Sequence, residues 1–206
     1  MIVVRKLVKS HQKRPIIIMK AIKSYFSDLR TAGVFAMLCM CCALSTDANS
    51  QVWKIYSFAD AFISVEMPFS ASKYSLALPE DIRKQVQSIS VYKAESAELF
   101  TLISYNKYIS GVTADARKAA EGAANNLRQG EGVLDFRYNH KLIKVGNRDA
   151  YDLTCTYRIG LTGYTYRSVL VAEGDALWQV ACVYQTSAKT AETNTNRILK
   201  SVQILK

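Results

Sequence analysis

Residues 177–184 read Leu-Trp-Gln-Val-Ala-Cys-Val-Tyr, and Gln179 is the only polar residue among these eight. A strand with one solvent-facing side alternates apolar and polar residues, and this run does not. It is instead typical of a strand that is covered on both faces. The rest of the chain should therefore provide neighbouring strands, and helices that cover both faces of a sheet.

A hairpin is predicted immediately before this strand. Gly174-Asp175 is a turn signal, and it separates the strand from a second apolar run over residues 164–172. A two-residue loop at Gly174-Asp175 places Trp178 opposite Val171. The two strands then share one continuous apolar surface.

A second hairpin is predicted before that one. Residues 151–158 alternate between apolar and polar side chains, and Gly160-Leu161-Thr162-Gly163 follows them as a turn. A two-residue loop at Leu161-Thr162 would place Tyr157 opposite Tyr166. Because Leu-Thr is an unusual pair in such a loop, a wider loop is the alternative.

Helical spacing of apolar residues predicts two helices. The first follows Thr113, the expected N-cap, and ends at Gly130. The second covers about residues 188–201, after an N-cap at Ser187, and should supply cover for the central strand. The first helix has a face of small side chains that allows close approach to a sheet, made of Ala116, Ala119, Ala120, Ala123, Ala124 and Leu127.

Shorter apolar or alternating runs predict the remaining elements. Strands are expected over residues 53–58, 62–67, 87–93, 99–108 and 133–145, and residues 80–84 could form a single helical turn. We therefore expect one α+β domain over residues 51–206, with a largely antiparallel sheet of about six or seven strands covered by two main helices. A hydrophobic content of 50% and a charged content of 21% exclude a disordered chain.

The first fifty residues have the pattern of an export signal. Met19 is the expected true start, basic residues follow it, and residues 31–44 are uncharged. That run is too short to span a membrane and has the length of a signal-peptide core. Small residues at Ala48 and Ser50 predict cleavage before Gln51. The alternative is an uncleaved N-terminal anchor. With cleavage, we expect a periplasmic or secreted bacterial protein without stable membrane insertion.

Three cysteines in the signal segment raise the question of a lipid anchor. A lipidation site has a small residue before the modified cysteine, but Cys39, Cys41 and Cys42 follow Leu38, Met40 and Cys41. The match is poor, and a lipid anchor is not the preferred interpretation. The mature chain keeps Cys155 and Cys182, which the predicted register places two strands apart on opposite faces. We therefore expect two free, buried thiols and no disulfide.

No assembled catalytic, cofactor or metal site is predicted. His140 is the only histidine after residue 11, and we expect it at a solvated strand edge or turn rather than in a zinc site. The acidic pairs Asp149/Asp152, Glu131/Asp135 and Glu80/Asp81 have the pattern of charged surface. Of the formal net charge of +10, residues 1–50 contribute +6, so the mature chain is only weakly basic and nucleic-acid binding is not expected.

Tyrosines are concentrated in the last three long strands. Tyr157, Tyr164 and Tyr166 form the candidate binding patch, because large half-polar rings on one sheet face suit partner recognition. The alternative is ordinary core packing, since strands favour tyrosine.

The order of these features resembles the PsbP-like family. The first feature is an aromatic-led strand that runs into Phe62-Ile63-Ser64-Val65-Glu66-Met67-Pro68, and it is followed by a hairpin ending near Tyr105 and by the alanine-rich helix. Next comes the glycine turn in Val145-Gly146-Asn147-Arg148-Asp149-Ala150-Tyr151-Asp152-Leu153. The last features are the Gly174-Asp175 hairpin into Leu177-Trp178 and a final helix ending Ile198-Leu199-Lys200-Ser201-Val202. Family members usually have a small residue or proline where this chain has Arg148-Asp149.

The resemblance implies a fold and no chemistry. The family includes an extrinsic subunit of photosystem II, a Ran-binding nuclear import factor and small exported bacterial proteins of unknown function, and it has no catalytic motif to transfer. We therefore expect a non-enzymatic binding or accessory protein of the cell envelope, acting on a protein partner through a sheet face or edge. A carrier of a small apolar ligand between sheet and helix is the second hypothesis, and an enzyme the third.

Overall fold

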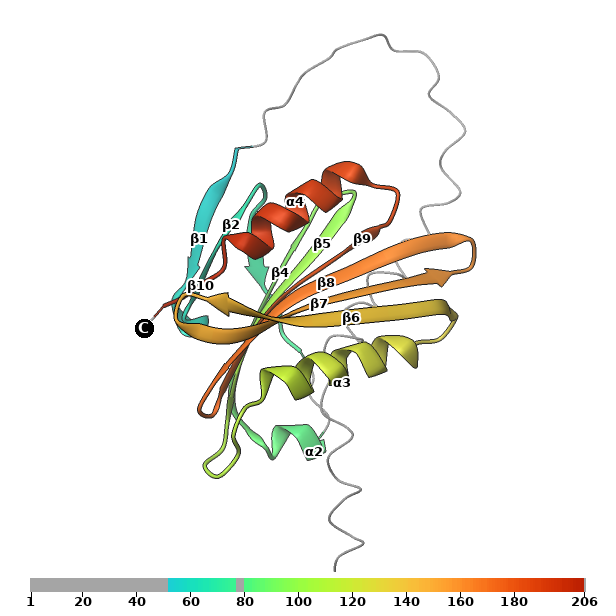
Figure 1. The fold of residues 1–206 in the computed structure, drawn as a ribbon. Helices are drawn as coiled ribbons and strands as arrows, with labels where there is room; N and C mark the ends of the chain where they lie inside the picture. The colour runs from blue at the N-terminus through green and yellow to red at the C-terminus, as the bar shows by residue number, and fades with distance from the viewer. Residues whose placement is uncertain (1–51, 77–79, 206) are drawn as a thin grey trace, which may run out of the picture.

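The computed structural model of the chain describes residues 52–76 and 80–205. The predicted leader, signal and cleavage site lie outside these residues. The elements follow one another as β1 (Lys54–Phe58), a 3₁₀ helix (Ala59–Ala61), β2 (Ile63–Met67), β3 (Ala71–Lys73), α2 (Glu80–Arg83), β4 (Val86–Glu95), β5 (Leu99–Tyr108), α3 (Ala116–Arg128), β6 (Val133–Val145), β7 (Arg148–Ile159), β8 (Thr162–Glu173), β9 (Ala176–Gln185), α4 (Lys189–Lys200) and β10 (Gln203–Ile204) (Figure 1).

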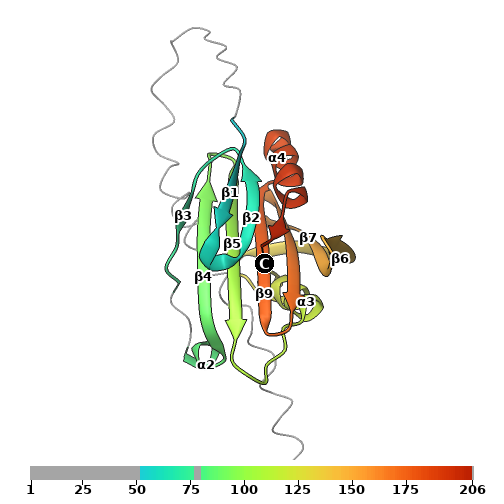
Figure 2. The ribbon, with the colours of Figure 1, turned by 90° about the vertical axis from the view of Figure 1, so that its left-hand side faces the viewer.

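The strands of the described residues form two antiparallel sheets. The large sheet has seven strands in the order β3-β4-β5-β9-β8-β7-β6, and the small sheet has three in the order β1-β2-β10. The small sheet lies against β4, β5 and β9 of the large sheet (Figure 2). The fold is therefore α+β, as the sequence predicts.

Strand β9 lies at the centre of the large sheet, between β5 and β8. All its residues from Ala176 to Tyr184 are buried. This confirms that the apolar run over residues 177–184 is covered on both faces. The sequence did not predict that β5 is one of its neighbours, because the β5–β9 pairing joins strands that are far apart in the chain.

Each face of the large sheet has its own hydrophobic core. On the first face, which we call the α4 face, Val169, Trp178 and Val180 pack with residues of α4 and the small sheet. On the second, the α3 face, Leu153 and Leu170 pack with the alanine-rich side of α3. Ala120 and Ala124 have no exposed surface, so the small side chains of α3 serve close packing on the sheet.

The two predicted hairpin registers have different outcomes. The register at Gly174 is confirmed, since Val171 pairs with Trp178. The register of β7 and β8 is corrected: Ile159 pairs with Thr162, so the two-residue loop is Gly160-Leu161 rather than Leu161-Thr162. The loop begins at Gly160 because its φ of +60° fits a tight hairpin turn that glycine adopts without strain.

The helix starts also differ from the predictions. The N-cap of α3 is Asp115, whose Oδ1 accepts a hydrogen bond from the Lys118 amide at 3.0 Å, and not Thr113. Helix α4 begins after Ala188, whose side chain makes no capping bond, and not after Ser187. Buried Ala191, Ile198 and Leu199 confirm that α4 covers the sheet.

Cys155 and Cys182, the two cysteines of the described residues, are free and buried, as predicted. Cys155 belongs to the α3 face and Cys182 to the α4 face. Burial raises the pKa of the Cys155 thiol to about 12 and that of Cys182 to about 11. Both side chains are therefore protonated core residues at neutral pH. In the described part of the chain, no helix is long and apolar enough to cross a membrane.

Candidate interaction surface at the edge of the large sheet

The predicted tyrosine patch lies mostly inside the protein. Tyr157 and Tyr166 are buried in the core of the α3 face, and Tyr164 is half-buried with its ring 5.8 Å from that of Tyr157. This corrects the predicted patch, because the alternation that brings Tyr157 and Tyr166 to one face brings them to the face that α3 covers. The two buried rings are core residues and are not exposed to a partner.

His140 lies on β6 near α3 and is more enclosed than predicted. Its side chain is 21% exposed, and its Nε2 lies 3.9 Å from Glu121 Oε1. Its ring packs between those of Tyr138 and Tyr151, with centroid distances of 6.2 and 5.6 Å. Among the described residues, no group of three or more His, Cys, Asp or Glu side chains could hold a metal ion.

A carboxylate that the sequence did not single out connects the small sheet to the large one. Asp60 accepts hydrogen bonds from Lys73, Tyr92 and Ser90. The bonds from Lys73 and Tyr92 hold the Asp60 pKa at about 2, and the bond to Asp60 is the main cause that raises the Tyr92 pKa to about 12. The cluster ties the 3₁₀ helix to β3 and β4, so its role is structural.

A second ion pair anchors the small sheet to α4. Arg197 donates to both carboxylate oxygens of Glu66, at 2.6 and 3.1 Å, and its guanidinium lies 4.1 Å from the ring centroid of Trp53. A shallow groove beside this pair is lined by Glu66 and by residues of α4 and its C-terminal end. Glu66 and Arg197 in its lining bond each other and hold β2 to α4.

The most open part of the large sheet is its β6 edge. The opposite edge strand, β3, has three residues, whereas β6 has thirteen. An edge strand presents unpaired backbone N–H and C=O groups along one side. Apart from Val145, no residue of β6 is buried. Strand β6 is the last strand of the large sheet, next to β7 (Figure 1). A long row of unpaired backbone groups therefore lies along its outer side.

A bulge divides β6 into two parts. The pairing with β7 shifts between Leu134 and Arg137, and Asp135 adopts a φ of +51° there. From Arg137 to Val145 the register is regular, opposite residues 148–156 of β7. Bulges end or redirect strand pairing, so the regular part of the edge begins at Arg137.

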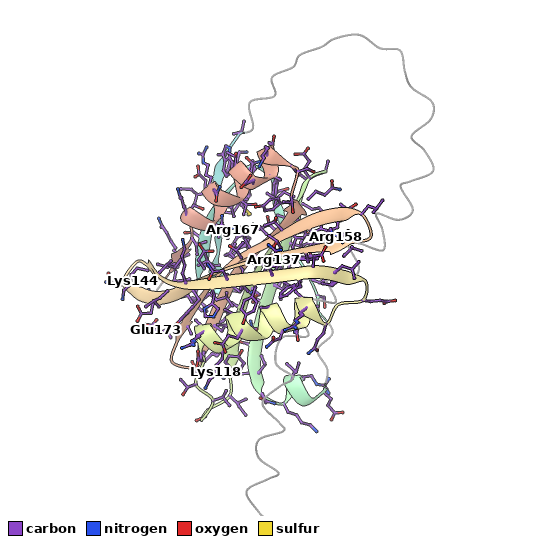
Figure 3. All side chains as sticks on the ribbon, turned by 45° about the vertical axis from the view of Figure 1, so that its right-hand side comes forward. Lys118, Arg137, Lys144, Arg158, Arg167 and Glu173 are labelled. Carbon is purple, nitrogen blue, oxygen red and sulfur yellow. The ribbon has the colours of Figure 1, made fainter. Side chains whose placement is uncertain are left out.

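Cationic side chains lie on the α4 face of the regular part of β6 and of the strands next to it. Arg137 and Lys141 lie opposite Thr156 and Asp152, and Arg167 is on the next strand but one. Figure 3 shows Arg137 and Arg167 over the strands between α4 and β6. Arg167 donates to Asp152 at 3.2 Å and bonds Asn196 of α4, which links this surface to the helix.

The solved structure of cyanobacterial PsbP (CyanoP) from Synechocystis sp. PCC 6803 is similar to this one. The TM-score is 0.54 and the sequence identity 12%, over 81% of this chain and 98% of that chain. The fold is PsbP-like. At this identity the similarity concerns the fold alone, and it confirms the fold that the sequence resemblance implies.

Two further solved structures are less similar to this one. LpqN of Mycobacterium tuberculosis, a protein involved in cell envelope biogenesis, has a TM-score of 0.40 and 14% identity, over 75% of this chain and 79% of that chain. A protein of unknown function, PA94 of Pseudomonas aeruginosa, has a TM-score of 0.38 and 14% identity, over 71% of this chain and 95% of that chain. No protein-family model and no curated protein matches the sequence.

Proposed function

We propose that the protein is an exported accessory protein of the cell envelope that binds a protein partner through the β6 edge of its large sheet. The observation that carries this proposal is the long, unburied edge of β6 with its regular register from Arg137 onward. An extended segment of a partner can add to such an edge by backbone hydrogen bonds, while side chains on both faces provide specificity.

The geometry of the titratable groups favours binding over catalysis. Asp60, Glu66 and Tyr92 have shifted pKa values because each is bonded to a side chain of another element. These bonds hold elements of the fold together and do not form a reactive site. The proposed binding needs only the exposed backbone and side chains of β6.

The apolar-ligand carrier has less support. It requires space between the sheet and α3, but Ala120 and Ala124 are fully buried in the same cluster as Leu153 and Tyr166. These small side chains bring the helix close to the sheet.

Crosslinking in intact cells tests the proposed function. A photo-crosslinking amino acid at position 138 on β6 is expected to capture one discrete protein, and the same amino acid at position 72, on the opposite edge strand β3, is not. Both positions are exposed in the structure, which makes them a matched pair. N-terminal sequencing of the protein itself, recovered from the cell envelope, is expected to begin at Gln51. A retained Met1 or Met19 contradicts export with cleavage, and an equal yield from both positions, or none from 138, contradicts the β6 interface.

A further inference from the structure

We infer that the partner segment that adds to β6 is an extended strand in which acidic residues alternate with apolar ones. This inference rests on the proposed function and names the chemistry of the partner. It follows from the difference between the two faces of β6.

Successive side chains of β6 point to opposite faces of the sheet. Arg137 and Lys141 lie opposite Thr156 and Asp152, on the α4 face. Tyr138 and Leu142, with His140 between them, lie opposite the odd-numbered residues 151, 153 and 155, on the α3 face. A strand added beside β6 would continue both faces, so its alternate side chains would meet two different surfaces.

The α4 face of the edge has cationic groups that could accept an acidic partner. The Arg137 side chain is exposed and makes no hydrogen bond or ion pair with any described residue. Lys141 Nζ is 3.7 Å from Asp152, but that carboxylate is 12% exposed and already accepts from Arg167 at 3.2 Å. Directly opposite side chains on paired strands lie about 5 Å apart. Acidic residues of an added strand would therefore be close to Arg137 and Lys141.

The α3 face of the edge carries exposed apolar side chains, with Lys144 after them near the end of the strand. The exposed fraction of Tyr138 is 48% and that of Leu142 is 59%. Apolar residues of the added strand would remove these side chains from water, which is favourable by about 25 cal/mol per Å² of apolar surface. The two requirements together define an alternating pattern of acidic and apolar residues.

The sequence of β6 disfavours pairing with the β6 strand of a second copy of the chain. The regular part of β6, residues 137–145, carries Arg137, Lys141 and Lys144 and no acidic residue. Pairing two copies through it would place four cationic side chains on the α4 face and two on the α3 face, and like charges on paired strands are destabilising. The same cations therefore disfavour self-association through β6 and favour an acidic strand.

Peptide binding to the full-length exported protein tests the inference. The probe is a peptide of about nine residues in which glutamate alternates with leucine, and its controls are the lysine–leucine peptide and one of the same composition with all glutamates at one end. We expect the alternating glutamate peptide to bind about tenfold more tightly than either control and to slow backbone amide exchange in β6. Equal affinity for the glutamate and lysine peptides, or protection outside β6, overturns the inference.

Charge reversal sharpens this test. Arg137→Glu together with Lys141→Glu is expected to reverse the preference, so that the lysine peptide binds more tightly. Lys54→Glu, at an exposed position on β1 of the small sheet, is the control and is expected to leave the preference unchanged. An unchanged preference in the double variant overturns the inference.

The crosslinked partner separates this inference from the proposed function. Sequencing the segment attached at position 138 is expected to identify alternating acidic and apolar residues. A discrete adduct through a basic or non-alternating segment overturns the inference and leaves the β6 interface standing. The absence of any adduct contradicts the interface itself.

Discussion

At the scale of single residues, two buried tyrosines differ in their hydrogen bonding. Tyr166 Oη accepts a hydrogen bond from Gln179 Nε2 at 2.8 Å, and both side chains are buried. Tyr157 Oη is buried without a hydrogen-bond partner among the described residues. Burial raises the pKa of both phenols, so both hydroxyl groups are uncharged at neutral pH. The two hydroxyl groups should therefore contribute differently to stability.

Removing these hydroxyl groups should change the stability of the protein differently. Tyr157→Phe is expected to leave the free energy of unfolding unchanged or raise it by about 1 kcal/mol, because it removes a polar atom that is buried without a partner. Tyr166→Phe is expected to lower it by about 1–3 kcal/mol, because the Gln179 amide then remains buried and unpaired. Chemical denaturation of both variants measures the difference. A similar loss in both would show that Tyr157 Oη has a partner.

Sequence alternation predicted which face of the sheet each residue lies on, but not which helix packs against that face. It placed Cys155 and Cys182 on opposite faces, which is why the free thiols were predicted correctly. It also placed Tyr157 and Tyr166 on one face, but alternation does not show which face a distant helix covers. The exposed Tyr138 and Leu142 could have been noticed as apolar residues in the charged run over residues 133–145. Their position at the edge follows only from the strand order.

At the scale of elements, the turn between β7 and β8 contains two glycines, and their presence led to the wrong prediction of the loop residues. The segment Gly160-Leu161-Thr162-Gly163 permits more than one loop, and the choice between them shifts the register of the pair. In the structure Gly160 has a φ of +60°, while Gly163 lies in β8 and pairs with Arg158. Backbone conformation therefore fixes the loop, and the residue types alone did not.

Alanine substitution distinguishes the two glycines. Gly160→Ala is expected to lower the free energy of unfolding by about 1 kcal/mol, because an alanine at positive φ is strained even though space is available for its Cβ. Gly163→Ala is expected to cost less, because its Cβ would lie at an ordinary distance of 3.5 Å from Thr186 Oγ1. Thermal unfolding of both variants provides the comparison. A larger loss for Gly163→Ala would favour the loop at Leu161-Thr162.

The shortest strands show what sequence periodicity cannot detect. Strand β3 (Ala71–Lys73) and strand β10 (Gln203–Ile204) were not predicted, because such short segments have no measurable alternation. Each forms by pairing with a longer strand, β3 with β4 and β10 with β2. The small sheet as a separate unit was therefore also not predicted.

At the scale of the whole molecule, two carboxylates join the small sheet to the rest of the protein. Asp60 bonds side chains of β3 and β4, and Glu66 of β2 bonds Arg197 of α4. Hydrogen bonds from Lys73 and Tyr92 lower the Asp60 pKa from 3.8 to about 2, and the bond from Arg197 lowers that of Glu66. Both acids are thus more easily ionised in the folded state than in the unfolded one.

Acid should therefore weaken the attachment of the small sheet. A carboxylate whose pKa is lowered by folding stabilises the protein above its unfolded pKa, and this contribution is lost as the pH falls toward the folded value. We expect the free energy of unfolding to be constant above about pH 5 and to decrease as the pH falls toward 2. Asp60→Asn with Glu66→Gln should be less stable at neutral pH and should flatten this decrease. An equally steep acid dependence in the double variant would place its origin in other groups.

The protein has only two tryptophans, and both lie where the small sheet meets the rest of the molecule. Trp178 Nε1 donates to the Ala61 carbonyl at 2.9 Å, and Trp53 lies under the Arg197 guanidinium. Intrinsic fluorescence should therefore report separation of the small sheet selectively, since emission depends on the polarity around the indole rings. Neither ring is on β6, so a ligand that occupies that edge should leave the emission spectrum unchanged.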